Sequence, residues 1–127
     1  MTPEEQYKEG LLINAIEGCK KQQNVIIAGI NSDKEEIELF EVYKDQLIEA
    51  IAFLKTTQCI VSLSEFRKIK YEIAKSNENI AFKMKAIKEM ESFFKQKQVE
   101  MNNFLRDLDR LRIHCRRGLV VPFRRVK

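Results

Sequence analysis

The residues whose side chains could do chemistry are few in this sequence, and their spacing fits no common catalytic or metal-binding pattern. The chain has one histidine, His114, and three cysteines, Cys19, Cys59 and Cys115. Structural zinc sites usually draw cysteine ligands in close pairs, and disulfide frameworks use an even number of cysteines. The adjacent His114 and Cys115 allow two interpretations: a nucleophile with its base, or a helix-end histidine beside a small buried thiol. The second is favoured, and no metal is expected.

Sequence motifs for catalysis are missing as well. The chain contains no P-loop, dinucleotide-binding, zinc-protease, nucleophile-elbow or EF-hand pattern. Asp107 and Asp109 are two residues apart, so on a helix they point to different faces and cannot share a carboxylate site. A di-metal helical bundle needs Glu-x-x-His motifs, which a single histidine cannot supply. We therefore expect a non-enzymatic protein without a cofactor.

Cationic side chains are concentrated near the end of the sequence. Residues 1–63 carry six Lys and eleven acids (6 − 11 = −5), whereas residues 64–127 carry seventeen Lys and Arg and eight acids (17 − 8 = +9). The candidate contacts for phosphate groups or an acidic protein surface are Arg106, Arg110, Arg112, Arg116, Arg117, Arg124, Arg125 and Lys127. Three interpretations stay open: the acidic half folds against the basic half, the basic end binds a nucleic acid, acidic protein or membrane surface, or it is a solvated tail.

Composition predicts an all-α fold in a single domain. The chain has 127 residues, of which 44% are hydrophobic and 33% charged, with only 4 Gly and 2 Pro. A β-sandwich or barrel needs more Gly and Pro residues than this to form its turns. The sequence contains no run of about 18 apolar residues, the length that a membrane-spanning helix needs, and the acidic amino terminus does not resemble a secretory signal. These observations predict a cytoplasmic protein with no membrane partner.

Three helix starts are predicted from capping boxes, in which a Ser or Thr cap is followed three residues later by Glu. The boxes begin at Thr2, Ser32 and Ser62. They predict helices over about residues 3–23, 33–57 and 63–117, packed in one domain over 1–117 as an antiparallel helical hairpin or three-helix arrangement. An apolar connector is expected over 25–30 and an extended basic tail over 118–127. Gly118 is expected to end the third helix, because glycine is common just beyond a helix end. A break in this helix near Asn77 is the alternative.

The predicted third helix carries the strongest pattern in the sequence, an apolar residue at every seventh position. These eight residues are Phe66, Ile73, Ile80, Ile87, Phe94, Met101, Leu108 and Cys115. A second series, three or four residues later, holds Ile69, Met84, Met90, Phe104 or Leu105, and Leu111. Apolar heptads of this length are typical of a coiled coil, and polar layers at Ser76/Asn77 and Lys97/Gln98 would restrict its register and partners.

Helix lengths then suggest an interaction surface. At 1.5 Å per residue, the first two predicted helices span roughly 30 and 37 Å and the third roughly 80 Å. The predicted seam for binding another copy or another protein is Phe94, Met101, Phe104, Leu105, Leu108 and Leu111. Such a stripe is seldom left in water. Either a partner covers it, or the helix breaks near Asn77 and folds back. If the stripe is an interface, Leu108→Asp should abolish assembly and leave the shorter helices folded.

The leading hypothesis is a helical assembly protein that oligomerises or docks into a larger complex through its coiled-coil helix and Arg-rich tail. The Lys-, Ile- and Glu-rich composition and short length would suit a phage or mobile-element component. The alternative is a nucleic-acid-binding accessory protein, in which the C-terminal arginines contact phosphates without reading sequence.

Overall fold

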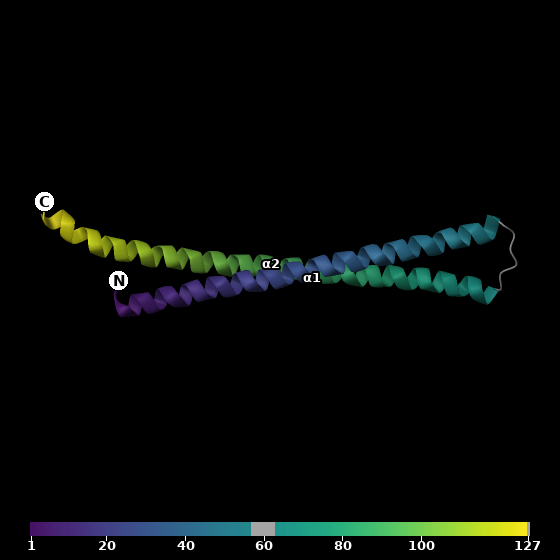
Figure 1. Cartoon of the computed structure of the whole chain (residues 1–127), viewed down its shortest axis with the longest axis horizontal. Coiled ribbons are helices and arrows are strands. Elements are labelled where there is room, and N and C mark those ends of the chain that lie inside the picture. Colours follow the sequence, from purple (N-terminus) through teal and green to yellow (C-terminus); the bar gives the residue numbers. More distant parts are fainter. Residues whose placement is uncertain (57–62, 127) are drawn as a thin grey trace. The chain divides into compact units, whose positions relative to one another are not determined.

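The computed structural model contains two long helices, α1 over Pro3–Thr56 and α2 over Leu63–Val126 (Figure 1). It describes the backbone of residues 1–56 and 63–126, and the side chains of residues 1–56 and 64–116. The predicted all-α class is confirmed. The three-helix arrangement is not, because the described residues form two helices that pack together.

The start of α1 follows the capping box expected at Thr2. The Thr2 hydroxyl accepts a hydrogen bond from the backbone N–H of Glu5 at 3.2 Å and donates one to the Glu5 carboxylate at 3.0 Å. This arrangement satisfies an N–H group that has no partner inside the helix. The predicted box at Ser62 begins outside the described residues.

α1 is unbroken through residues 24–32, so the predicted end near residue 23 and the second start at residue 33 are wrong. The residues that turn inward alternate at intervals of three and four along the whole helix. They are Leu12, Ile16, Cys19, Gln23, Ile26, Ile30, Asp33, Ile37, Phe40, Lys44, Leu47, Ile51 and Leu54, all buried or half-buried. A helix continues where tertiary packing of one face continues, and this outweighs the local capping preference of Ser32.

α2 confirms the apolar heptad and removes the alternative break near Asn77. All eight predicted positions from Phe66 to Cys115 are buried or half-buried, and the helix runs through Ser76, which is 3% exposed. In the second series, Ile69, Met90, Phe104 and Leu111 are half-buried, as predicted. Met84 and Leu105 are exposed, and Lys83 takes the inward position predicted for Met84. The expected helix end at Gly118 and the extended tail are not confirmed, since α2 reaches Val126. Glycine permits a helix end but does not require one.

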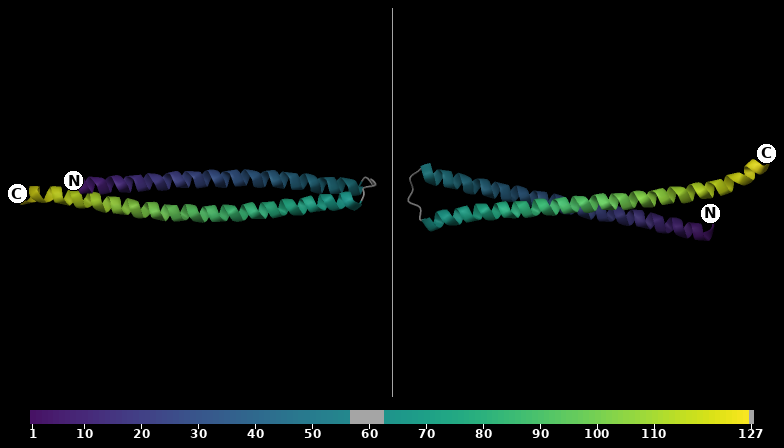
Figure 2. Two further views of the ribbon diagram at one scale, coloured as in Figure 1. Left: turned by 90° about the horizontal axis from the view of Figure 1, so that it is seen from below. Right: turned by 180° about the vertical axis from the view of Figure 1, so that it is seen from behind.

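Two compact units can be distinguished, each formed by one segment of α1 and one of α2. Unit 1 comprises Met1–Ile27 and Ser92–Lys127, and unit 2 comprises Ala28–Glu91. Within each unit the two segments lie side by side (Figure 2). They are antiparallel: in unit 1, Glu9 of α1 meets Arg112 and Gln23 meets Gln98.

The unit cores are thin layers of side chains between two helices. In unit 1, Ile16 and Cys19 of α1 cluster with Met101 and Leu108 of α2, and the partly buried Leu12, Ile13 and Phe104 pack around them. In unit 2, Ile80 and Ile87 are the buried apolar side chains of α2. None of the described large side chains is less than 2% exposed. A pair of helices therefore leaves most of each helix surface in water.

Candidate interaction surfaces

The predicted interaction seam lies inside unit 1. Met101 is 8% exposed and Leu108 5% exposed, both in the cluster with Ile16 and Cys19, and Phe104 packs against that cluster. The far part of the long helix is therefore covered by α1, which contradicts the expectation that a second copy or another protein must cover it. The reason is the unbroken α1: its 54 residues span about 80 Å, more than twice the length assumed for either shorter helix.

The same finding corrects the expected effect of Leu108→Asp. Leu108 packs against α1 of its own chain, so the change strikes the core of unit 1 instead of an interface. Of the other seam residues, Phe94 and Leu111 are half-buried at inward positions, and Leu105 is 39% exposed on the outside.

Gln23 makes a buried polar layer in unit 1 that the sequence patterns did not predict. Its side chain is 7% exposed, and its amide N–H donates to the Gln98 side-chain oxygen at 2.9 Å and, more weakly, to the Phe94 carbonyl at 3.5 Å. Gln98 in turn donates to Asn102 at 3.0 Å. Buried amides satisfied in this way restrict the register of a coiled coil. The predicted polar layer at Lys97/Gln98 pointed to the α2 half of this network.

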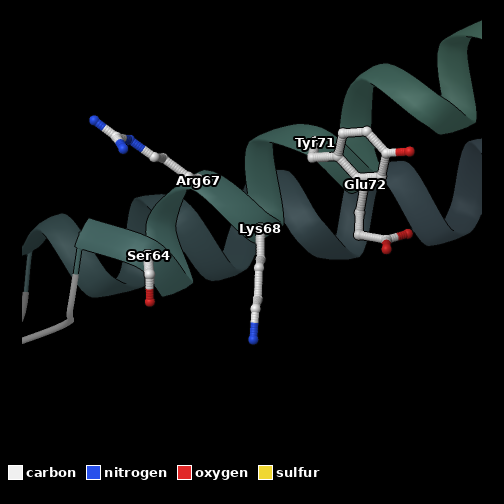
Figure 3. A pocket seen from close by; sticks show the side chains of 5 residues that line it. All are labelled: Ser64, Arg67, Lys68, Tyr71 and Glu72. Atoms are coloured by element: carbon white, nitrogen blue, oxygen red, sulfur yellow. The ribbon is translucent and has the colours of Figure 1, made fainter.

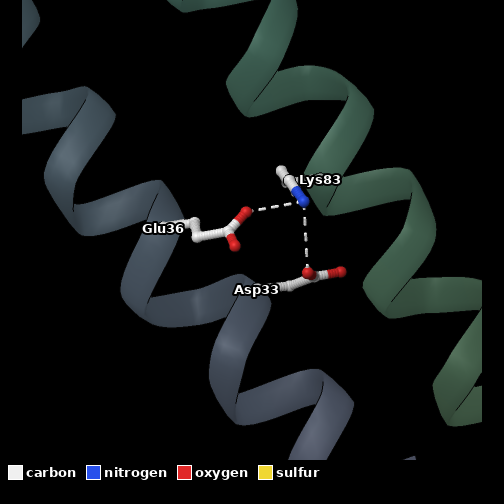
Figure 4. Close-up of polar contacts among 3 residues, drawn as sticks. All are labelled: Asp33, Glu36 and Lys83. Carbon is white, nitrogen blue, oxygen red and sulfur yellow. Dashed lines mark hydrogen bonds and ion pairs between the residues drawn. The ribbon is translucent and has the colours of Figure 1, made fainter.

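Unit 2 contains an ion-pair cluster in which one lysine of α2 binds two carboxylates of α1. The Lys83 ammonium lies 2.6 Å from the Glu36 carboxylate and 3.4 Å from that of Asp33 (Figure 4). The hydrogen bond to Glu36 is the main cause of the raised pKa of Lys83, and Asp33 adds to it. Lys83 and Asp33 both occupy inward heptad positions that an apolar residue would normally hold.

The pairing of Lys83 gives stability that depends on pH in the alkaline range. Because the folded-state pKa of Lys83 is raised, the protonated lysine stabilises unit 2 at neutral pH, and this contribution is lost as pH rises through the raised pKa. We expect the melting temperature to fall on the alkaline side more steeply for the wild type than for Lys83→Gln. Equal alkaline slopes in melts at low salt would contradict this prediction.

Ion pairing between the helices follows the charge asymmetry of the sequence. In the described residues, each ion pair that joins the helices links an acid of α1 to a base of α2: Glu9 with Arg112 at 3.3 Å in unit 1, and the Lys83 cluster in unit 2. This favours the first of the three interpretations, in which the acidic half of the chain folds against the basic half. Arg112, one of the candidate phosphate contacts, is the base of the pair in unit 1.

The remaining arginines are only partly described. Arg106, Arg110 and Arg116 are exposed on α2, and Arg106 and Arg110 lie one turn apart on the same face. The side chains of Arg117, Arg124, Arg125 and Lys127 lie outside the described residues. Their use as phosphate contacts stays a prediction.

His114 and Cys115 do not form a nucleophile–base pair. Adjacent helical residues point in different directions, and the Cys115 thiol instead donates a hydrogen bond to the Glu5 carboxylate of α1. This bond raises the pKa of Cys115 and, together with the Thr2 hydroxyl, lowers the pKa of Glu5. A raised pKa keeps the thiol protonated and poorly nucleophilic. Cys59 lies outside the described residues.

A hollow of about 580 Å³ in unit 2 is lined by polar side chains of α2 alone, but these do not converge. In Figure 3, Ser64, Lys68 and Glu72 point to one side of α2 at successive turns, whereas Arg67 and Tyr71 point in other directions. A catalytic or ligand site needs groups that meet at one point. Across the part of the chain that the structure describes, no group of His, Cys, Asp and Glu side chains could hold a metal ion.

Exposed apolar side chains are the most unusual feature of the surface. Seventeen large hydrophobic side chains are exposed among the described residues, against six buried apolar ones. In unit 2 the most exposed on α1 are Leu39 at 70%, Phe53 at 63% and Val42 at 55%. In unit 1 a groove of about 380 Å³ is lined by Lys21, Gln22, Val25, Ile26, Phe93 and Lys97. Where such side chains adjoin one another, they are candidates for an interaction surface.

Over the described residues, the architecture is all-α: two antiparallel helix segments pack along heptad positions in each unit. No protein-family model matches the chain, and no match was found among the curated proteins or the solved structures. No helix within residues 3–56 or 63–126 is long and apolar enough to cross a membrane.

Proposed function

We propose that this chain is a non-enzymatic helical assembly protein that associates through apolar side chains outside its own heptad seam. The observation that carries the proposal is the excess of exposed over buried large apolar side chains. In a two-helix coiled coil the seam is satisfied within the chain, so the outward apolar positions are the surface left for association. They belong to both units, with Val25 and Phe93 in unit 1 and Leu39 and Phe82 in unit 2.

Helical packing supports this function better than catalysis or ligand binding. A second layer of helices would bury these side chains, each fully buried one contributing about 1.5–3 kcal/mol. Thin two-helix cores gain most from such a layer, because one pair of helices buries few side chains completely. The side chains around the hollow of unit 2 diverge (Figure 3), so it offers no comparable ligand site.

The proposal predicts a molar mass above the 15.0 kDa of one chain at micromolar concentration. Multi-angle light scattering over a concentration series is the measurement. The matched variant carries Val25→Gln, Leu39→Gln and Phe93→Gln, all at exposed positions. We expect this variant to elute as a monomer with unchanged helix content. A wild-type mass of 15.0 kDa at every concentration would contradict the proposal.

A further inference from the structure

Unit 2 carries a row of exposed apolar side chains on α1. The inference about what covers this row rests on the proposed function. The row is formed by Leu39, Val42 and Tyr43, which are 70%, 55% and 43% exposed. Leu39 and Tyr43 each lie one residue before an inward heptad position, Phe40 and Lys44. Leu39 and Tyr43 therefore lie roughly a quarter-turn from the seam, and Val42 lies further round, on the outer side of α1. Together they form a second apolar face.

Acidic side chains border this row. Glu35 and Glu49 lie seven residues before and after Val42, which places all three on one line of the helix. Both glutamates are exposed, and neither has an ion pair with a described residue. We call Leu39, Val42 and Tyr43, together with these two glutamates, the acidic row. An occupant of the row needs apolar side chains with positive charge beside them.

Unit 1 of the same chain carries the complementary surface. Its groove has Val25, 72% exposed, and Phe93, 56% exposed, as apolar walls, with Ile26 half-buried between the helices. Its charged lining residues are lysines only, Lys21 and Lys97, and Lys97 is also paired with Glu100 at 3.1 Å. We call the surface formed by Lys21, Gln22, Val25, Phe93 and Lys97 the basic groove.

Unit 1 has a net positive charge, like its basic groove, and unit 2 has a net negative charge, like its acidic row. The residues of unit 1 include thirteen Lys and Arg and seven acids (13 − 7 = +6), and those of unit 2 include ten bases and twelve acids (10 − 12 = −2). Complementary fields of this kind steer association and select the partner. Each copy of the chain thus carries one acidic row and one basic groove.

We propose that the occupant of the basic groove is a second copy of this chain, bound through its acidic row. Leu39 and Val42 of one copy pack on Val25 and Phe93 of the other. Glu35 and Glu49 face Lys21 and the positive surface of unit 1. Units of the same kind carry net charge of the same sign and repel each other, so the contact joins unlike units.

Charge reversal on each side separately, followed by mixing, tests this contact. The groove variant is Lys21→Glu with Gln22→Glu, and the row variant is Glu35→Lys with Glu49→Lys; all four positions are exposed. Each variant alone should self-associate about tenfold more weakly than the wild type. An equimolar mixture should return to within about threefold of wild-type affinity, because the reversed groove meets the reversed row and the two native surfaces also meet.

The measurement is sedimentation velocity on each variant and on the mixture at low salt, with helix content checked by circular dichroism. The control is Glu72→Lys with Glu89→Lys, which makes the same charge change at two exposed positions of α2 in the same unit, outside the acidic row, and should leave association unchanged. Self-association that survives both reversals, or a mixture that stays as weak as its components, overturns the row-on-groove contact while leaving the proposed function standing. A wild type that is monomeric throughout overturns both.

Discussion

Leu108→Asp is expected to lower the free energy of unfolding by about 4 kcal/mol or more and to unfold unit 1. Leu108 is 5% exposed and packs with Ile16, Cys19 and Met101. Loss of a buried leucine costs about 2–5 kcal/mol, and a carboxylate in the same place adds the cost of burying a charge without a partner. Urea unfolding followed by far-UV circular dichroism measures the loss.

Ile113→Asp is the matched control for this experiment. Ile113 lies five residues further along α2 and is 48% exposed, so its replacement should change stability by no more than about 0.5 kcal/mol. If Leu108→Asp kept the wild-type melting curve and changed only the molar mass, the packing of α1 on this part of α2 would be wrong.

Lys83→Glu is expected to have the second largest effect, by separating the α1 and α2 segments of unit 2. The change would place a third carboxylate beside those of Glu36 and Asp33, at a site where the ammonium now lies 2.6 and 3.4 Å from them. Like charges at this distance repel, and the inward position keeps them from moving fully into water. We expect a fall in melting temperature of many degrees at neutral pH, measured by circular dichroism at low salt.

Reversing all three charges provides the rescue. The triple variant Lys83→Glu with Asp33→Lys and Glu36→Lys restores opposite charges across the helix pair, and it should recover most of the lost melting temperature. Lys85→Glu is the control, since Lys85 is exposed on the outer side of α2. A triple variant no more stable than Lys83→Glu alone would show that side-chain size, not charge, governs this layer.

How much of the fold the sequence predicted differs between the two helices. The first series of the α2 seam was predicted correctly, because all eight of its positions are apolar and the periodicity is visible directly. The second series was predicted only in part, since Met84 and Leu105 are exposed. The α1 seam has the same regularity, but Gln23, Asp33 and Lys44 interrupt its apolar pattern. Gln23 and Asp33 face inward and are compensated by partners on α2, which the sequence of α1 alone does not contain. The alternation of three and four residues continues through Ile26 and Ile30, and this spacing is the signal for a continuous helix.

Local capping signals explain the remaining errors. Thr2 is a cap in the structure, whereas Ser32, with an equally good box, lies in the middle of α1. A cap stabilises a helix end by about 1 kcal/mol, less than the packing that a helix break would disrupt on either side. The predicted interaction surface is wrong for the same reason. Two separate short helices could cover only the near half of α2, whereas the unbroken α1 brings Ile16 and Cys19 against Met101 and Leu108.

The polar layer of Gln23 has a consequence for how unit 1 folds. A heptad pattern nearly repeats itself when one helix slides by seven residues along its partner, so apolar contacts alone would tolerate several alignments. A slide that brings Leu105 opposite Gln23 in place of Gln98 leaves a buried amide without its side-chain acceptor, at a cost of about 1–3 kcal/mol. Misaligned pairs therefore come apart more readily than the aligned one. Gln23 therefore favours one register between two helices whose apolar patterns are nearly periodic.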